Sequence, residues 1–342
     1  MTPGRHAHRI QPWTTGLIDW EEKNRSLKDA SVTGPGSAPK EVWLNGRDHF
    51  GGMGVHLSWG VHRTLGDWHA RSRAHRHPYP ECLFFVGLDT ANVHYLGAEV
   101  EISLGGEREV HAFNEPTVVV LPAGTPHGPI TTKRVYSPRG FGFLAVGLHA
   151  TQEITWLEKG GDEAGAHAPE GAPQGGGKYG HLVKSLKTGL ITERGRPVTA
   201  RFTPKELAAR GEFQKRTGFR PGPGSPDHMT WMYGRDLENL DLNVAWGFSS
   251  GAGISQRGVE AHSHPEDEIL VYLGTDPDHP DDLGAEIEID LGEEHERHLF
   301  DRSTFIACPA GMPHGPIVTR WVDRPFAFLL INLARNVSMS FE

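Results

Sequence analysis

The chain contains two copies of one sequence unit, and this internal repeat limits its fold more than any other feature. Residues 75–130 align with residues 262–317 at a constant offset of 187 positions without a gap, and 28 of the 56 aligned pairs are identical. Self-similarity over such a length indicates one structural unit that occurs twice. A chain of 342 residues also exceeds what a single hydrophobic core usually serves. We therefore expect two domains of the same fold.

Composition suggests where the two domains begin and end. The stretch from residue 158 to residue 178 is rich in Gly, Ala and Pro and contains no aromatic residue, which is typical of an exposed linker. We predict an N-terminal extension at 1–39, an N-terminal domain at 40–157, this linker at 158–178, and a C-terminal domain at 179–342.

The hydrophobic pattern within each repeat indicates strands. Residues 98–104 alternate between apolar and polar side chains, as in a strand that is buried on one face. Residues 117–121 and 326–331 are continuous apolar runs, as in strands buried on both faces. One helix is predicted at 203–215, where Thr203 and Glu206 form a capping box, and residues 17–28 at the corresponding place are a second helix candidate. A strand-rich unit that is repeated predicts an all-β protein with two small sandwiches or barrels.

Chemistry-bearing residues are concentrated at matching places in the two repeats. The sequence has 21 histidines, and His75, His77 and Glu81 in the first repeat correspond to His262, His264 and Glu268 in the second. Alternate residues of a strand point to one face, so the two histidines of each pair should lie side by side. A proline then favours a turn, and the glutamate opens the next apolar run, where an antiparallel neighbour would return it to the histidines.

A third histidine follows each glutamate at the same distance. His127 and His314 each lie 46 residues after it and follow a Pro-Ala-Gly-x-Pro turn. Imidazole nitrogens together with a carboxylate suit a borderline divalent metal. Four protein ligands on a six-coordinate ion leave two positions for a substrate, or for a substrate and dioxygen. We predict eight metal ligands in two sites: His75, His77, Glu81, His127, His262, His264, Glu268 and His314.

These motifs resemble those of the cupin superfamily, in the two-domain form called bicupin. The first cupin motif is matched by the His-x-His-x3-Glu pattern and a following Gly87 or Gly274, with one residue fewer before the glycine than the usual spacing. The second motif, Pro-x-Gly-x2-His, is matched at 122–127 and 309–314, without the asparagine that often follows it. The resemblance implies two tandem jelly-roll barrels, also called double-stranded β-helices, with short helical segments. It also implies a homo-oligomer.

The resemblance specifies a metal site much more closely than it specifies a reaction. Our leading hypothesis is a non-haem Fe(II) or Mn dioxygenase that acts on a small oxygenated organic molecule, with no catalytic residue beyond the metal ligands. Fe(II) is the favoured metal, and Mn, Ni and Zn are alternatives. A decarboxylase or isomerase that uses the metal as a Lewis acid is the second hypothesis. A metal-bearing sensor or binding protein is the third. The first motif lacks the tryptophans of oxalate decarboxylases, which disfavours oxalate chemistry.

Charge offers one distinction between the two sites. The first has positive or aromatic residues nearby, whereas the second has Glu266 and Asp267 on its turn, so an anionic substrate would favour the first. The residues concerned in the first repeat are Arg73, Arg76, Tyr79, Lys133 and Arg134. The sequence does not decide whether one site or both are catalytic.

Composition also limits partners and location. The net charge is −9 and no basic run occurs, so nucleic acid and anionic membranes are not expected partners, and a small molecule is. The N-terminal residues lack the apolar stretch of a signal peptide, so we expect a cytoplasmic protein. Cys82 and Cys308 cannot form a disulfide framework, and each lies in an apolar run that predicts a small buried side chain.

Overall fold

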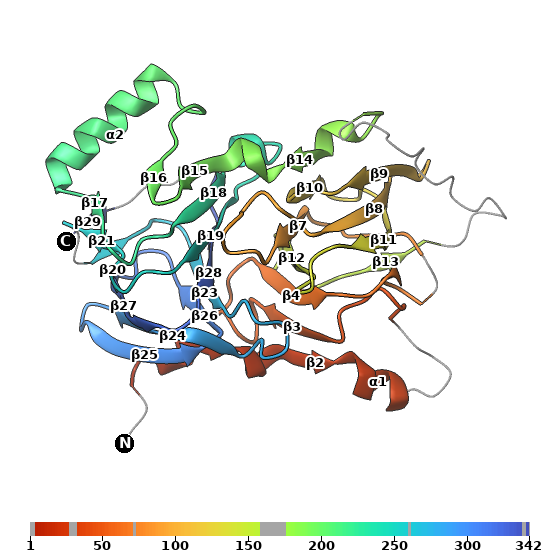
Figure 1. The fold of residues 1–342 in the computed structure, drawn as a ribbon, viewed down its shortest axis with the longest axis horizontal. Coiled ribbons are helices and arrows are strands. Elements are labelled where there is room, and N and C mark those ends of the chain that lie inside the picture. The colour runs from red at the N-terminus through yellow and green to blue at the C-terminus, as the bar shows by residue number, and fades with distance from the viewer. Residues whose placement is uncertain are drawn as a thin grey trace. The chain divides into compact units, whose positions relative to one another are not determined.

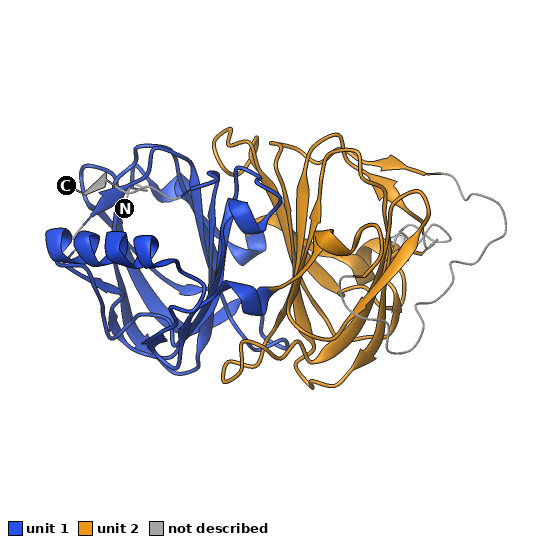
Figure 2. Ribbon diagram, turned by 90° about the horizontal axis from the view of Figure 1, so that it is seen from above, with its two compact units in different colours: residues 1–14, 186–342 blue, residues 15–185 orange. Residues whose placement is uncertain are grey.

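The computed structural model describes residues 4–26, 33–70, 73–157, 176–258, 261–336 and 340–341. The chain divides into two compact units, which Figure 2 shows in different colours. Residues 15–185 form one unit, here called the N-terminal barrel, and residues 1–14 with 186–342 form the other, the C-terminal barrel. Most of the predicted linker lies outside the described residues. In the described part of the chain, no helix is long and apolar enough to cross a membrane.

The N-terminal barrel consists of two antiparallel sheets (Figure 1). One has the order β14-β10-β7-β12-β4-β3-β2, with bounds Val183–Ser185, Thr117–Leu121, Glu81–Gly87, Phe141–Gly147, His56–His62, Lys40–Asn45 and Leu17–Asp19. The other has the order β13-β6-β11-β8-β9, with bounds Thr155–Trp156, His75–Arg76, His127–Val135, Ala98–Leu104 and Glu109–Phe113, and β5 (Gly66–Asp67) also pairs with β11.

The C-terminal barrel repeats this arrangement. Its larger sheet has the order β1-β26-β23-β28-β19-β18-β15-β16, with bounds Ile10–Pro12, Thr304–Cys308, Glu268–Leu273, Phe326–Asn332, Asn243–Ser249, His228–Met232, Leu190–Glu193 and Arg196–Pro197. Its smaller sheet has the order β25-β24-β27-β22-β29, with bounds Glu296–Arg302, Asp282–Leu291, His314–Val322, His262–Ser263 and Ser340–Phe341, and β20 (Gly253–Ile254) pairs with β27. A separate pair joins β17 (Arg220–Pro221) to β21 (Gln256–Arg257).

Each barrel includes a short edge strand from the chain segment that precedes the other repeat. Strand β1 pairs with β26 of the C-terminal barrel, and β14 pairs with β10 of the N-terminal barrel. Residues 1–39, which the sequence suggested were one extension, are therefore divided between the two units. Residues 179–185, assigned from the sequence to the C-terminal domain, belong to the N-terminal barrel. Both edge strands cover otherwise unpaired backbone groups of equivalent strands.

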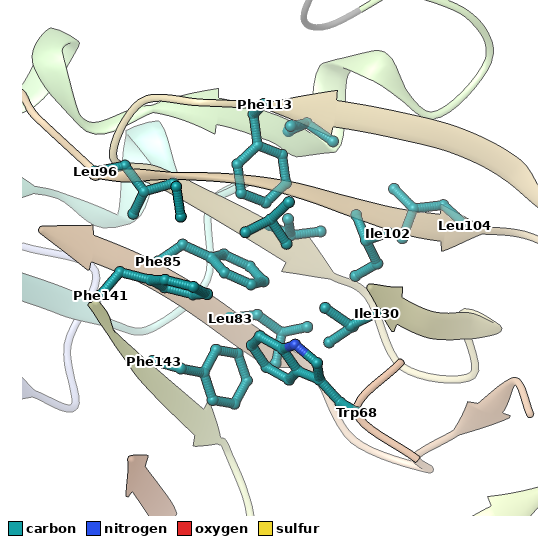
Figure 3. Close-up of a cluster of buried hydrophobic side chains, with 14 of the residues drawn as sticks. Trp68, Leu83, Phe85, Leu96, Ile102, Leu104, Phe113, Ile130, Phe141 and Phe143 are labelled. Atoms are coloured by element: carbon teal, nitrogen blue, oxygen red, sulfur yellow. The ribbon is translucent and has the colours of Figure 1, made fainter. Parts of the chain in front are cut away.

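The hydrophobic cores lie inside the barrels, as the strand patterns predicted. Residues 98–104 form β8, whose apolar side chains are buried on the inner face, and Figure 3 shows the aromatic and aliphatic side chains that surround them. The equivalent cluster of the C-terminal barrel is built on β24. Cys82 and Cys308 are both buried and unbonded, which confirms the prediction for them.

Helices are few and peripheral. Among the described residues there are two α-helices, α1 at Trp20–Ser26 and α2 at Pro204–Thr217. The 3₁₀-helices are η1 to η5, at Ala7–Arg9, Trp13–Gly16, Gly180–Leu182, Leu186–Gly189 and Gly234–Asp236. The helix expected at 203–215 is confirmed as α2. The expectation for 17–28 is met only in part, because residues 17–19 form β2 and residues 27–28 lie outside the description.

The N-terminus of α2 provides a first prediction. The Thr203 hydroxyl accepts a hydrogen bond from the Glu206 backbone, and the Glu206 carboxylate accepts one from the Thr203 backbone at 2.7 Å. Replacing Thr203 by Ala should destabilise the helix by about 1 kcal/mol, because the capping hydroxyl is lost. Hydrogen exchange of residues 207–217 should become faster. Glu212→Ala, which removes only an exposed pair with Lys215, should change it much less.

Candidate metal centres

In the N-terminal barrel three of the four predicted ligands lie on strands of the two sheets, and His77 follows the end of β6. His75 on β6 lies directly opposite His127, the first residue of β11, in the smaller sheet. Glu81 begins β7 in the larger sheet, where its neighbours are β10 and β12. The expectation that strand pairing returns the glutamate to the histidines is therefore wrong in its details. The carboxylate instead reaches them across the barrel interior.

The ligand atoms of this cluster lie close together. The Nε2 atoms of His77 and His127 are each 3.4 Å from Oε2 of Glu81. One nitrogen from each of His75, His77 and His127 lies within 4.8 Å of the other two, and all three side chains are buried. The ring centroids of His75 and His127 are 4.2 Å apart.

The C-terminal barrel repeats the cluster with small differences. His262 on β22 lies opposite His314 on β27, and Glu268 begins β23. Nε2 of His314 is 3.0 Å from Oε2 of Glu268, and Nε2 of His264 is 3.5 Å from Oε1. One nitrogen from each of the three histidines again lies within 4.8 Å of the others. The structure therefore assembles both of the predicted four-residue sets.

The donor atoms fit a divalent metal ion. Two ligands at right angles, each about 2.1 Å from an ion, would be about 3.0 Å apart, close to the observed separations of 3.0 to 3.5 Å between nitrogen and oxygen. Oε1 of Glu268 is buried and has no hydrogen-bond partner within the described ranges. Buried polar atoms are normally paired, so a cation that this oxygen coordinates would account for it.

Burial keeps most of these imidazoles neutral. It lowers the pKa of His127 to about 3 and, in the other barrel, that of His262 to about 3. Burial also raises the pKa of Glu81 to about 8. Burial alone would raise the pKa of Glu268, but its three histidine neighbours outweigh this and hold it below the ordinary value. Neutral imidazole is the form that coordinates a metal, so the histidines with a lowered pKa can bind a cation without first losing a proton.

Backbone carbonyls orient several of the rings. Nδ1 of His77 donates to the carbonyl of Glu153 at 2.7 Å, and Nδ1 of His127 donates to that of Thr125 at 3.1 Å. His314 makes the equivalent bond to Met312 at 3.1 Å. With a proton on Nδ1, the lone pair is on Nε2, the atom that faces the carboxylate. Hydrogen bonds of this kind fix the ring and its tautomer in metal sites.

The charged residues near the first site are less available than the sequence suggested. Lys133 lies 3.5 Å from Glu101, and Arg134 lies 3.5 Å from Glu99. Tyr79 is buried, and its ring stacks between those of His77 and His149. The positive charges of the two β11 residues are therefore balanced by acids, which weakens the electrostatic reason for preferring this site.

Sequence reasoning missed one aromatic residue beside the first cluster. Trp156 on β13 pairs with His75 in the backbone register, and its ring centroid lies 5.0 Å from that of His75. In the other barrel, Phe341 on β29 pairs with His262 in the same way. An aromatic residue at the equivalent place of both repeats was the available signal, but it lies outside the gap-free alignment.

Comparisons with known proteins support the fold. No family model and no curated protein matches the sequence. Solved structures of oxalate decarboxylase from Bacillus subtilis, including one at pH 4.6, are similar, with 14% identity and a TM-score of 0.52. The likeness covers 95% of this chain and 78% of that one. A further structure of the same enzyme, with equal identity and coverage, concerns its Mn(II) centres. The likeness extends over both repeats.

Proposed function

We propose that this chain, which has the bicupin fold, is a metal-dependent enzyme that acts on a small organic acid or a similar oxygen-rich molecule. The observation that carries the proposal is the convergence of three buried histidines and a glutamate in each barrel. The ligands would be His75, His77, Glu81 and His127 in one barrel, and His262, His264, Glu268 and His314 in the other.

A divalent metal held there would supply Lewis acidity, or redox chemistry if it is iron or manganese. The protein's own residues hold neutral nitrogens and one carboxylate in place and surround them with an apolar wall. That wall excludes water and strengthens every electrostatic interaction within the barrel. Four protein ligands leave positions at which the oxygens of a substrate can bind.

We infer decarboxylation as the first candidate reaction. It is supported by the structural likeness to a decarboxylase, although the missing tryptophans of the first motif point to a substrate other than oxalate. Dioxygenation, the leading hypothesis from the sequence, is the second candidate, because a site without thiolate ligands suits iron and dioxygen equally well. Mn(II) and Fe(II) are the two metals to test, the former because the similar enzyme has Mn(II) centres.

Turnover assays separate these candidates. Protein loaded with Mn(II) or Fe(II) is mixed with a panel of keto acids, hydroxy acids, diketones and diphenols, and CO₂ release and O₂ uptake are measured together. A decarboxylase should release CO₂ without stoichiometric O₂ uptake, whereas a dioxygenase should consume one O₂ per turnover. The His75→Ala, His262→Ala double variant is the control and should be inactive. Activity that survives in metal-free protein would contradict the proposal.

A further inference from the structure

The interiors of the two barrels differ at one position that is equivalent in both. The backbone amide of Trp68 donates to the carbonyl of Ile130 at 3.0 Å, and that of Ser255 donates to the carbonyl of Ile317 at 2.9 Å. Trp68 and Ser255 therefore occupy the same place beside the smaller sheet, but only the first has a large side chain.

Trp68 fills the N-terminal barrel. Its ring stacks on His62 at a centroid distance of 3.6 Å and meets the edge of Phe143 at 4.8 Å. Figure 3 shows Trp68 among the core side chains, including Phe143 and Ile130. Phe113, Ile130 and Phe143 have exposed fractions of only 3%, 5% and 8%. The interior of this barrel is therefore close-packed.

Among its described residues, the C-terminal barrel lacks an equivalent of the stacked pair of Trp68 and His62, because serines stand at both positions. Ser249 stands at the strand position of His62, opposite Phe326 as His62 is opposite Phe141. The side chains equivalent to those three buried residues are only partly buried, and they are Phe300, Ile317 and Phe328. All three pack against the interior cluster of this barrel. The partial exposure of these side chains indicates that the interior of this barrel is less completely filled than that of the N-terminal barrel.

Two buried polar side chains of this barrel have no hydrogen-bond partner within the described residues. Asn332 on β28 lies directly opposite Glu268, and Tyr272 on β23 lies opposite Phe328. Cross-strand partners share a face, so both side chains point into the barrel. Asn332 is 0% and Tyr272 is 2% exposed, and within the described residues no hydrogen bond is made by Oδ1 or Nδ2 of Asn332 or by the Tyr272 hydroxyl. In the N-terminal barrel, Gly147 stands at the place of Asn332, and Phe85 stands at the place of Tyr272.

Leaving such groups buried and unpaired is costly, so a ligand is the simplest explanation. The neighbouring Asn243 shows the contrast. It also lies in the row of Glu268 and Asn332, but its amide oxygen accepts from Gly234 and its amide nitrogen donates to the carbonyl of Ala334. Both polar atoms of the Asn243 amide are thus hydrogen-bonded within the protein, whereas those of Asn332 are not.

We propose that the C-terminal barrel is the compartment for the organic substrate, and that Asn332 positions the substrate by hydrogen bonding to it. This inference rests on the proposed function. Leu270 and Leu330 line the wall between the rows of Glu268 and Tyr272, so the substrate class is an organic acid with an apolar body. The N-terminal cluster then binds a metal ion that stabilises its own close-packed barrel and does not bind the substrate. This assignment is opposite to the one that surface charge alone favoured.

The test uses cobalt and a chelating probe on the full chain. Co(II) absorbs visible light in a way that depends on its ligands, and benzohydroxamate binds a metal through two oxygens while its ring extends away. The probe should change the spectrum of one of two bound Co(II) ions. The response should persist in His75→Ala protein and be absent from His262→Ala protein. Benzohydroxamate should also bind at least about 10-fold more tightly than acetohydroxamate, because its ring buries apolar area.

Two substitutions then examine the compartment itself. Ser255→Trp should weaken benzohydroxamate binding by more than about 100-fold at unchanged cobalt content, because the ring fills the space as Trp68 does. Arg257→Trp, which places the same side chain at an exposed position two residues later, should leave binding unchanged. Asn332→Leu should weaken binding by roughly 10-fold. It should not lower the melting temperature, whereas a structural asparagine would lower it when replaced.

The outcomes are distinct. A probe response that is confined to the N-terminal barrel, or equal in both barrels, overturns this inference and leaves the proposed function standing. Asn332→Leu protein that melts earlier yet binds the probe normally also overturns it. Protein that binds no cobalt in either barrel overturns the proposed function as well. If Ser255→Trp protein does not fold, the one-site proteins and Asn332→Leu decide the question.

Discussion

Replacing His314 by Ala is expected to remove one metal equivalent from each chain. The histidine contributes one of four converging ligand atoms, and its Nε2 lies 3.0 Å from the Glu268 carboxylate. Loss of a residue that only orients a ligand typically weakens metal binding by 10 to 100-fold, so loss of a ligand itself should cost at least roughly 100-fold.

Metal content per chain, measured by mass spectrometry after dialysis, checks this expectation. Wild-type protein should hold two equivalents, His314→Ala or His127→Ala one, and the double variant none. His298→Ala is the matched control, because His298 lies in the same barrel and contacts Glu296 at 2.9 Å but is not part of the cluster. Unchanged metal in His314→Ala protein, or a loss in His298→Ala protein, would contradict the assignment.

The repeat and the two motifs predicted the fold because they restrict backbone geometry at many positions. An unbroken offset through the strands and turns means that both copies must place His75 and His262, or His127 and His314, in the same way. The sheet to which the glutamate belongs, and the side from which it approaches the histidines, could not be predicted in this way. Its strand pairs only within the larger sheet, and closure of the barrel, a property of the whole unit, brings it to the histidines.

The sequence also could not predict that each barrel takes its edge strand from the segment that precedes the other repeat. Residues 15–18 and 188–191 share the sequence Thr-Gly-Leu-Ile, so the segments around them are recognisably equivalent. Their pairing partners, β10 and β26, are equivalent too. Either segment therefore suits either barrel by its local sequence, and only the path of the connecting chain selects one arrangement.

Interior packing could be predicted least of all. The alignment of the repeats pairs Phe85 with Tyr272, and Trp68 and Ser255 stand at the same offset just upstream of it, but the sequence does not show which face these residues occupy. Burial of the unpartnered Asn332 and the partial exposure of Phe328 depend on the combined volume of many side chains. Such volume differences decide which barrel has room for a substrate, and they cannot be predicted from a sequence motif.

Replacing Trp68 by Ala should destabilise the N-terminal barrel by about 3–5 kcal/mol, because a buried aromatic ring is lost and a cavity remains. The ring is 5% exposed and stacks on His62, and its indole nitrogen donates to the Thr132 hydroxyl at 2.8 Å. The loss therefore removes a hydrogen bond as well as packing. It also leaves the Thr132 hydroxyl, in a residue that is 1% exposed, without this donor.

Hydrogen exchange measured strand by strand tests this prediction within the full chain. Amides of β8 and β10 should exchange faster in Trp68→Ala protein, whereas those of β24 and β26 in the other barrel should not change. Trp321→Ala, which removes a tryptophan that is 41% exposed, is the control and should have a small effect. Equal acceleration in both barrels would show that their stabilities are coupled. Little acceleration in β8 and β10 would show that Trp68 does not fill the N-terminal barrel. It would also remove the packing difference on which the assignment of the substrate to the C-terminal barrel depends.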